Sequence, residues 1–285
     1  MDSSGVRHRT IWALRRVAGA SAMIASVSTS TGRVVWIAIA PVKSMALVHL
    51  EHAHLGLAGI AGDRAFAVVD EASRLVNGKR VGTLALIRPN FDADARRLTL
   101  TFPEGDVVSG DVTFGDPIEA WFFGKPRGAW LVEGPWADAL SARARQPIRL
   151  VALRAGEGLD RGPSATLLST AALTSLAAAA GESDPLDRRR FRMTFGIDGV
   201  PAHAEDGWFG RDVRVGDAVV RPVGNVGRCA VTTHDPDTGV ASFDTLRILQ
   251  ATRGDLPTTE PLPFGVWADV VEAGDVSVGD PIGPT

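Results

Sequence analysis

The 285-residue chain contains a single cysteine, Cys229, in the segment GRCAVTTHDPDTG. A thiolate is a soft ligand suited to copper, zinc or a metal–sulfur centre, whereas a thiol in a core behaves as a small hydrophobic group. Arg228 places a permanent cation beside the thiol, and Gly224 and Gly227 let a bulky partner approach the backbone. One cysteine excludes an internal disulfide or an iron–sulfur cluster, so a metal here would need its other ligands from a cofactor. The sequence leaves both roles of the thiol open.

Four residues far from Cys229 have the chemistry to bind an anion. Lys43 and Ser44 occur in a short loop after a predicted strand, and Arg64 follows the turn AGD. Arg192 lies within the apolar alternation of FRMTF, which predicts an inward-facing arginine in a strand. Each is weak alone, because solvated lysines and arginines are common. Together they predict a phosphate-bearing ligand where two domains meet.

The acidic residues that follow Cys229 resemble a calcium loop only superficially. Asp235 and Asp237 lack the ligand spacing and the distal glutamate of such a loop. We expect HDPDTG to form consecutive turns that fix the exit of the strand carrying Cys229.

Composition limits the class of protein. Hydrophobic residues make up 45% of the chain and charged residues 22%, as in a globular protein, and the net charge is only −3. This balance favours neither nucleic acid nor an anionic membrane as a partner. No stretch reaches the roughly 18 apolar residues of a membrane-spanning helix. A lone thiol fits a reducing compartment, so we expect a cytoplasmic protein.

The elements that must position these residues are mostly strands. From residue 34 onward, short alternating runs bounded by Gly, Pro, Asp and Asn predict a β-meander. Helices are predicted within 134–145, within 167–181 with Ser169 or Thr170 as N-cap, and within 242–254. The expected fold class is therefore β-rich α+β.

Before Arg149 the sequence pattern is mainly that of short strands, and after it strands and helices are mixed. This change predicts two domains. An N-terminal β-barrel or sandwich is expected over residues 33–145, and a β-rich mixed domain over residues 146–285. Residues 1–32 are expected to form a disordered extension, with a short amphipathic helix over residues 10–18 as the alternative.

Several of these segments occur together in one protein family. PVKSM, GIAGDRAF, FRMTFGIDG and above all RCAVTTHDPDTG resemble the MOSC family, named after the C-terminal domain of molybdenum cofactor sulfurase. The likeness extends over residues 33–283. It is strongest to members with an additional N-terminal β-barrel domain, the group of the mitochondrial amidoxime-reducing component and its bacterial relatives. The resemblance implies a MOSC N-terminal β-barrel followed by a MOSC-type β-barrel with a few helices.

The resemblance also implies a cofactor and the residues that bind it. In that family the motif cysteine binds the molybdenum of Mo-molybdopterin, which makes Cys229 the implied metal ligand and catalytic residue. The segment 263–267 resembles a loop that closes over the cofactor. The implied cofactor contacts are Lys43, Ser44, Arg64, Ser164, Arg192, Arg228, Phe264 and Gly265.

The activity implied by the resemblance is reductive removal of oxygen from N-hydroxylated small molecules. Electrons would come from a separate flavin or iron–sulfur protein, because one cysteine cannot hold a cluster. A molybdenum cofactor carrier or sulfur-handling protein without turnover is the alternative. A third possibility, a barrel that has lost its cofactor, is disfavoured by the intact set Lys43, Arg64, Arg192 and Cys229. The family name derives from a fusion to a pyridoxal phosphate-dependent sulfurase, but the chain has no aminotransferase-like pattern, and pyridoxal phosphate is not expected.

Overall fold

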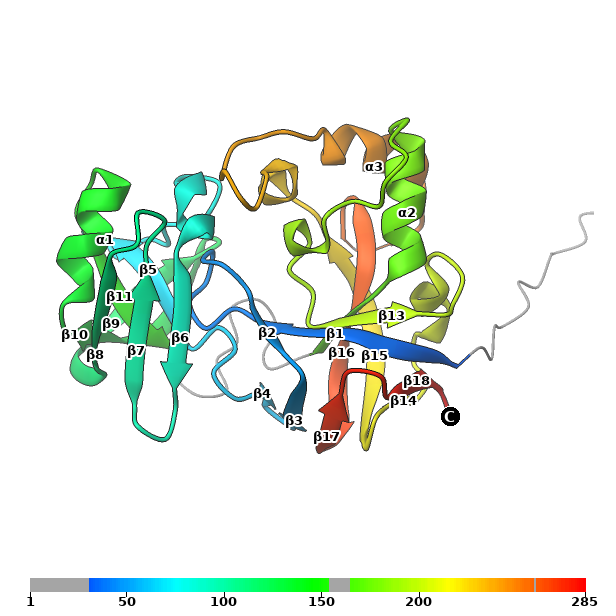
Figure 1. The fold of residues 1–285 in the computed structure, drawn as a ribbon, viewed down its shortest axis with the longest axis horizontal. Coiled ribbons are helices and arrows are strands. Elements are labelled where there is room, and N and C mark those ends of the chain that lie inside the picture. The colour runs from blue at the N-terminus through cyan, green and yellow to red at the C-terminus, as the bar shows by residue number, and fades with distance from the viewer. Residues whose placement is uncertain (1–30, 154–164, 259) are drawn as a thin grey trace, which may run out of the picture.

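The computed structural model describes residues 31–153, 165–258 and 260–285, which form two β-rich halves side by side (Figure 1). One half is a closed seven-stranded barrel, because β13 pairs with β12 on one side and with β1 on the other. β2 (Val48–Leu50) extends the sheet beyond β1. The barrel strands in order are β13 (Phe195–Asp198), β12 (Ala165–Ser169), β16 (Pro263–Glu272), β15 (Ala218–Gly227), β14 (Val213–Val215), β18 (Pro281–Pro284) and β1 (Gly32–Ile39).

The interior of the barrel is filled by alternate side chains of its strands, as in other small barrels. Val34, Phe195 and Val266 have no exposed surface and belong to this core. Outside the barrel, Trp36 packs so closely on β13 that a Cβ at Gly196 would lie 2.0 Å from its ring. Only glycine therefore fits at position 196.

Two helices cover the outside of the barrel (Figure 1). α2 (Thr170–Ala179) and α3 (Thr245–Arg253) contribute Leu173, Leu176 and Leu249 to a core cluster that includes Trp36. Ser169 precedes α2 as predicted, but its hydroxyl accepts a hydrogen bond from the His203 N–H at 3.1 Å instead of capping the helix.

The other half encloses a second core between two antiparallel sheets. α1 (Trp136–Ala144) packs on this core through Trp136 and Leu140, which are fully buried. One sheet has four strands, β5 (Phe66–Asp70), β11 (Ile148–Leu153), β10 (Lys125–Glu133) and β9 (Thr113–Phe122). The other has three, β6 (Arg88–Asp92), β7 (Arg97–Thr101) and β8 (Val107–Asp111).

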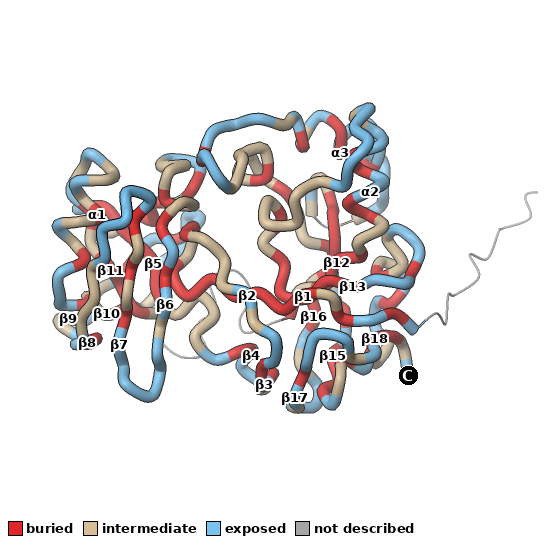
Figure 2. Tube along the Cα trace, in the orientation of Figure 1, coloured by how far each residue is buried: buried red, intermediate tan, exposed pale blue. Residues whose placement is uncertain are grey.

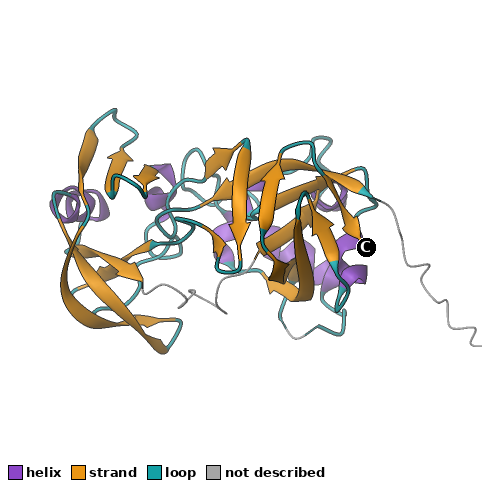
Figure 3. Ribbon diagram, turned by 90° about the horizontal axis from the view of Figure 1, so that it is seen from below, coloured by secondary structure: helices purple, strands orange, loops and turns teal. Residues whose placement is uncertain are grey.

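Strand pairing crosses the division expected at residue 145. β11 follows that residue but pairs with β5 and β10 of the first half, whereas β1 is a barrel strand. The expected domain limits remain a prediction. A further small sheet joins β17 (Gly274–Ser277) to β3 (His52–Gly56) and β4 (Gly59–Ile60), and Figure 3 shows the strands from below.

The three predicted helices are confirmed in position, each slightly shorter than its predicted range. His52 and His54 are exposed on β3. Buried residues follow the interiors of the two halves, and exposed residues follow the turns and outer faces (Figure 2). Within the described ranges, no helix combines the length and apolar character needed to cross a membrane.

Candidate functional site

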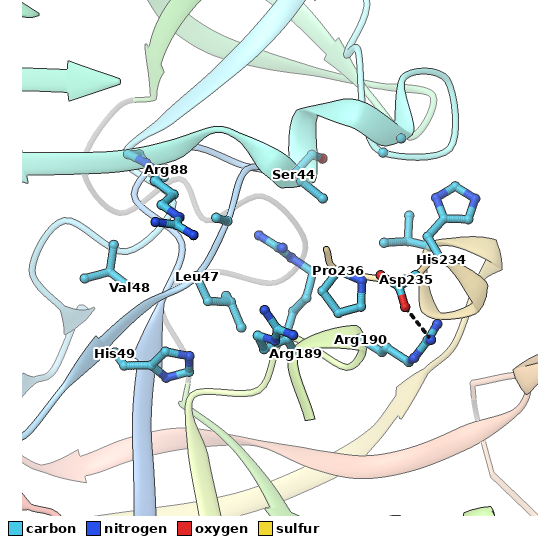
Figure 4. Close-up of a pocket in the computed structure, with 17 residues that line it drawn as sticks. Ser44, Leu47, Val48, His49, Arg88, Arg189, Arg190, His234, Asp235 and Pro236 are labelled. Carbon is cyan, nitrogen blue, oxygen red and sulfur yellow. Dashed lines mark ion pairs between the residues drawn. The ribbon is translucent and has the colours of Figure 1, made fainter. Parts of the chain in front are cut away.

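A cavity of about 410 Å³ lies between the two halves of the molecule (Figure 4). From the first half it is lined by the loop that leads into β2 and by the region of η1 (Gly82–Leu86). From the barrel half it is lined by η2 (Arg188–Arg190) with the residues that follow, and by η4 (Ala230–Thr233) with the turn after it. The walls of the cavity therefore come from segments nearly 200 residues apart in the sequence.

The lining of this cavity is strongly cationic. Arg88 reaches in from the first half, and Arg189 and Arg190 from the barrel half (Figure 4); Arg192 completes the set. Asp235 is the one carboxylate among the lining residues that the structure describes, and its Oδ2 lies 3.5 Å from Arg190 Nη2. Arg189 is paired with Asp187 and Asp237, whereas Arg88 and Arg192 form no ion pair with a described residue. Unpaired guanidinium ions at the wall of a cleft attract anions, phosphate above all.

Three of the residues predicted to bind an anion share an unusual backbone conformation. Ser44, Arg64 and Arg192 have φ values of 72°, 53° and 56°, in the left-handed region that non-glycine residues rarely occupy. Such strain persists where the surrounding structure imposes it, and it concentrates at functional sites. Ser44 and Arg192 line the cavity, so the fold holds both side chains there at a conformational cost.

Arg192 does not lie inside a strand, as the alternation had suggested. It sits between η2 and β13, which begins only at Phe195, because the left-handed conformation at Arg192 interrupts the extended chain. Its Nη2 atom is buried and has no hydrogen-bond partner among the described residues. Burial, reinforced by the nearby Arg64, lowers the pKa of Arg192 to about 10, so the guanidinium is charged at neutral pH.

Arg64 joins the two halves at the same place. Its Nη2 donates to the carbonyl oxygen of Arg192 at 3.3 Å, and its Nη1 forms an ion pair with Asp63. The Asp63 carboxylate in turn accepts the backbone N–H of Ala40 at 2.7 Å. Arg64 does not line the cavity, but it positions Arg192, which does.

Lys43 directly precedes the lining residue Ser44, and Cys229 lies two positions before the lining residue Val231, but neither lines the cavity itself. The ammonium group of Lys43 lies 5.1 Å from the centre of the Phe123 ring. Cys229 follows β15 and forms the N-cap of η4, so the prediction that it lies within a strand is wrong: the run of small residues ends the strand at Gly227. Its side chain is partly exposed and belongs to none of the core clusters, which does not support a packing role.

Known proteins share both halves of this arrangement. Residues 31–121 match the MOSC N-terminal beta barrel domain, and residues 162–283 match the MOSC domain. The chain belongs to the MOSC family.

Two similar proteins are both amidoxime-reducing components. The chain is 28% identical to mitochondrial amidoxime-reducing component 1 of Xenopus laevis, over 86% of this chain and 79% of that protein. It is 26% identical to the human component 1, over 88% of this chain and 82% of that protein. The YUAD protein of Bacillus subtilis resembles the structure at a TM-score of 0.41 and 12% identity, over 88% of this chain and 94% of that one.

Within the MOSC barrel, Arg228 is buried and links two backbone segments through its guanidinium group. Its guanidinium donates to the carbonyl oxygens of Phe191 and Phe264, each at 2.9 Å, and lies 2.9 Å from the sulfur of Met193. Burial lowers the pKa of Arg228 to about 9, and the neighbouring Cys229 partly opposes that shift. Arg228 thus fixes the backbone that leads into the motif cysteine. The cofactor contact expected of it remains a prediction.

The segment 263–267 of the MOSC barrel is not a loop. It forms the start of β16, because Phe264 and Val266 complete the packing beneath α2 and inside the barrel. The Phe264 ring is fully buried and lies 4.6 Å from the Phe191 ring. Gly265 has a φ of 74°, and a Cβ there would lie 2.6 Å from Met193 Cε. The prediction of a covering loop is wrong, and the cofactor roles expected of Phe264 and Gly265 stay untested.

The acidic turn after the MOSC cysteine is held by Arg189 and Arg190. Asp235 Oδ1 accepts the N–H groups of residues 237 and 238, which confirms the expected turns. The Arg189 guanidinium donates a hydrogen bond to each carboxylate oxygen of Asp237, both at 2.7 Å. This pairing holds the pKa of Asp237 below its ordinary value. Arg190 donates to the Thr233 carbonyl at 3.0 Å. In sequence the RRR run was indistinguishable from a solvated basic turn.

The remaining predicted residue, Ser164, lies outside the described residues. Arg88, His49 and His234 line the cavity without having been predicted. No local pattern marked them, because they lie in unrelated segments that only the fold brings together.

Proposed function

We propose that the chain binds a molybdenum–pterin cofactor in the cationic cavity and uses it to reduce N-hydroxylated compounds. The observation that carries the proposal is Arg192. Its buried Nη2 atom lacks a partner among the described residues, in the wall of a cavity whose lining contains four arginines and one carboxylate. A buried guanidinium without an acceptor is costly, and a phosphate group supplies the missing acceptor.

The residues present fit such a cofactor. In the described part of the chain, no group of three or more His, Cys, Asp or Glu side chains is placed to hold a metal ion. A metal bound beside Cys229 therefore needs most of its ligands from elsewhere, and the sulfur atoms of a pterin dithiolene meet that need. Cys229 is a partly exposed residue with no disulfide partner, which fits a thiol that binds such a centre.

The proposed roles of the protein follow from position and charge. Arg192 and Ser44 hold the cofactor phosphate, with Arg88 adding positive charge to the cavity wall. Arg64 keeps Arg192 in place through the bond to its carbonyl group. Lys43 and Ser164 remain proposed contacts from the family resemblance.

Cys229 is proposed as the protein ligand to the metal. Its position is set by Arg228 on one side and by η4 on the other, where the Cys229 carbonyl accepts hydrogen bonds from the N–H and the hydroxyl of Thr232, both at 3.0 Å. A ligand fixed by its backbone in this way needs little rearrangement on binding.

The cofactor, when bound, supplies the two-electron reduction that removes oxygen from an N–OH group. For a hydroxylamine-type substrate the balance is R–NHOH + 2e⁻ + 2H⁺ → R–NH2 + H2O. The names of the amidoxime-reducing relatives support this class of reaction. We propose a separate flavin or iron–sulfur protein as the electron donor and the cytoplasm as the location.

Metal analysis followed by a reduction assay tests the proposal. Protein purified from a host that makes molybdopterin is expected to contain close to one molybdenum per chain and to reduce benzamidoxime with a chemical electron donor. Folded protein without molybdenum would overturn the cofactor assignment. Molybdenum-loaded protein that reduces no N-hydroxylated compound would instead favour the cofactor carrier.

A further inference from the structure

A second pocket, of about 310 Å³, lies in the first half of the molecule near the end of β9. Two large aromatic side chains in its wall remain exposed to solvent, Trp121 at 44% and Phe123 at 54% of their surface. Between them in sequence, Phe122 is buried at 1%, so the strand does have a core-facing position. The pocket is lined by Arg74, Leu75, Asn77, Trp121, Phe123 and Gly124.

Phe123 occupies a position that a phenylalanine fits poorly. It forms, with Gly124, the two-residue turn between β9 and β10, and φ is 52° at Phe123 and 79° at Gly124. Turns with positive φ at both central residues favour Asn-Gly or Gly-Gly, and a bulky residue there is a conformational outlier. Because the ring is more than half exposed, core packing does not offset this cost. A strained residue that core packing does not account for is a candidate for contact with a ligand.

The wall of this pocket is held by backbone hydrogen bonds. The Trp121 N–H donates to the Ser73 carbonyl at 2.8 Å, and the Trp121 carbonyl accepts the Leu75 N–H at 2.9 Å. The Arg74 side chain is directed by Asp70, whose Oδ2 lies 3.3 Å from Arg74 Nε. The pocket is therefore preorganised by its backbone, a condition for tight contact with a rigid ligand.

The aromatic pocket adjoins the cationic cavity at two points along the chain. Ser44 lines the cavity, while the ammonium group of the preceding residue, Lys43, lies over the Phe123 ring. Gly78 lines the cavity, while the preceding residue, Asn77, lines the aromatic pocket. At each point one peptide bond links a residue of the cavity wall to a residue that lines the aromatic pocket or contacts Phe123, so the two pockets have neighbouring walls in the chain.

We propose that the aromatic pocket binds the planar ring of the substrate, so that aryl and heteroaryl N-hydroxylated compounds are preferred over alkyl ones. The inference rests on the proposed function, since it assigns the specificity of that same site. Flat rings stack on the faces of Trp and Phe regardless of their substituents. The Asn77 amide and the Arg74 guanidinium at the rim offer donors to the nitrogen and oxygen atoms of a heteroaromatic edge.

Two substrates with the same reacting group separate ring recognition from chemistry. Benzamidoxime has a ring and acetamidoxime has none, and both are assayed with the molybdenum-loaded full chain and a chemical electron donor. Trp121→Ala is expected to raise the KM for benzamidoxime roughly 10-fold while leaving its kcat, the KM for acetamidoxime and the molybdenum content unchanged. Equal effects on both substrates, or none on either, would overturn the proposal.

Phe123→Asn provides a second test in which stability and affinity change in opposite directions. It creates the preferred Asn-Gly turn, so the midpoint of thermal unfolding is expected to rise, whereas the KM for benzamidoxime is expected to increase several-fold. A stabilised variant with an unchanged KM would contradict a role for the Phe123 ring. An effect on rate that appears only with a protein electron donor would assign the pocket to donor docking and would likewise overturn the proposal.

A binding measurement keeps this inference distinct from the proposed function. Benzamidine and acetamidine, which cannot be reduced, are titrated into the full chain by calorimetry. Tighter binding of benzamidine that is lost in Trp121→Ala supports the aromatic pocket even if the chain reduces nothing. Equal binding of both compounds counts against the pocket even if the chain proves to be a reductase.

Discussion

The Arg64 guanidinium donates a hydrogen bond to the carbonyl oxygen of Arg192 across 3.3 Å, although 128 positions separate the two residues in the sequence. The contact joins the two halves of the molecule beside the cationic cavity. Both residues have left-handed backbone conformations, and the charge of Arg64 helps to lower the pKa of Arg192. Because Arg64 is already paired with Asp63, the close approach of the two cations favours an anion as the partner of Arg192, whose Nη2 atom has none among the described residues.

Replacing the motif cysteine tests its role directly. Cys229→Ala is expected to abolish molybdenum binding and benzamidoxime reduction, while the free energy of unfolding of the cofactor-free protein changes by no more than about 0.5 kcal/mol. The small change follows from the partial exposure of Cys229 and its absence from the core clusters. Metal content by mass spectrometry and urea denaturation measure the two quantities. Full molybdenum occupancy in this variant would rule out Cys229 as an essential ligand.

The substitution Arg192→Met removes a buried charge that the described residues do not satisfy. The cofactor-free protein is expected to become more stable to urea by about 1 kcal/mol, because methionine fills the space without a desolvation cost. Cofactor occupancy under limiting supply is expected to fall about 10-fold, since a charge-assisted hydrogen bond is lost. A variant that retains its cofactor would show that the Arg192 guanidinium does not bind the phosphate.

The same substitution at Arg228 is expected to change stability in the opposite direction. Arg228→Met removes the donors to the carbonyl groups of Phe191 and Phe264, and we expect a loss of about 3 kcal/mol in the free energy of unfolding. Urea denaturation of the cofactor-free protein measures it. The exposed substitution Arg221→Met serves as the control, with an expected change of less than about 1 kcal/mol. Equal stability of Arg228→Met and wild type would contradict the bracing role.

Glu205 is expected to make the free energy of unfolding depend on pH. Its carboxyl is fully buried, Oε1 accepts the Ser169 N–H at 3.1 Å, and Oε2 has no partner among the described residues. Burial is the main cause that raises its pKa from 4.5 to about 7. The folded state therefore keeps a proton that the unfolded state has already released. The stabilisation that the protonated Glu205 carboxyl contributes is fully present below pH 4.5. The free energy of unfolding is expected to fall by about 3 kcal/mol in total as pH rises from 4.5 to about 7.

Glu205→Gln is expected to remove this decline, because the amide keeps an acceptor for Ser169 and has no proton to lose. The variant should match the wild type at pH 4 and exceed its free energy of unfolding by about 3 kcal/mol at pH 8. Urea denaturation across this range measures the difference, with the exposed Glu182→Gln as a control that should show no such divergence. Parallel pH profiles for Glu205→Gln and wild type would mean that Glu205 titrates normally in the folded state.

The sequence alone determined the strand-rich class, the approximate positions of the three helices and the MOSC family. Periodicity and turn residues are local, and the RCAVTTHDPDTG segment is specific enough to identify the family without a structure. The turns formed by Asp235 and its neighbours were also predictable, because they depend on hydrogen bonds within five residues.

Only the tertiary structure decided what surrounds the site. Arg192 was expected in a strand and Phe264 in a loop, but closure of the barrel ended one extended segment and buried the other. The role of Arg188–Arg190 could not be read from the sequence. It depends on the Asp237 carboxylate and the Thr233 carbonyl, which bind Arg189 and Arg190 and lie in a distant segment of the chain. These outcomes depend on contacts between segments tens to hundreds of residues apart, and local patterns in a sequence carry no information about such contacts.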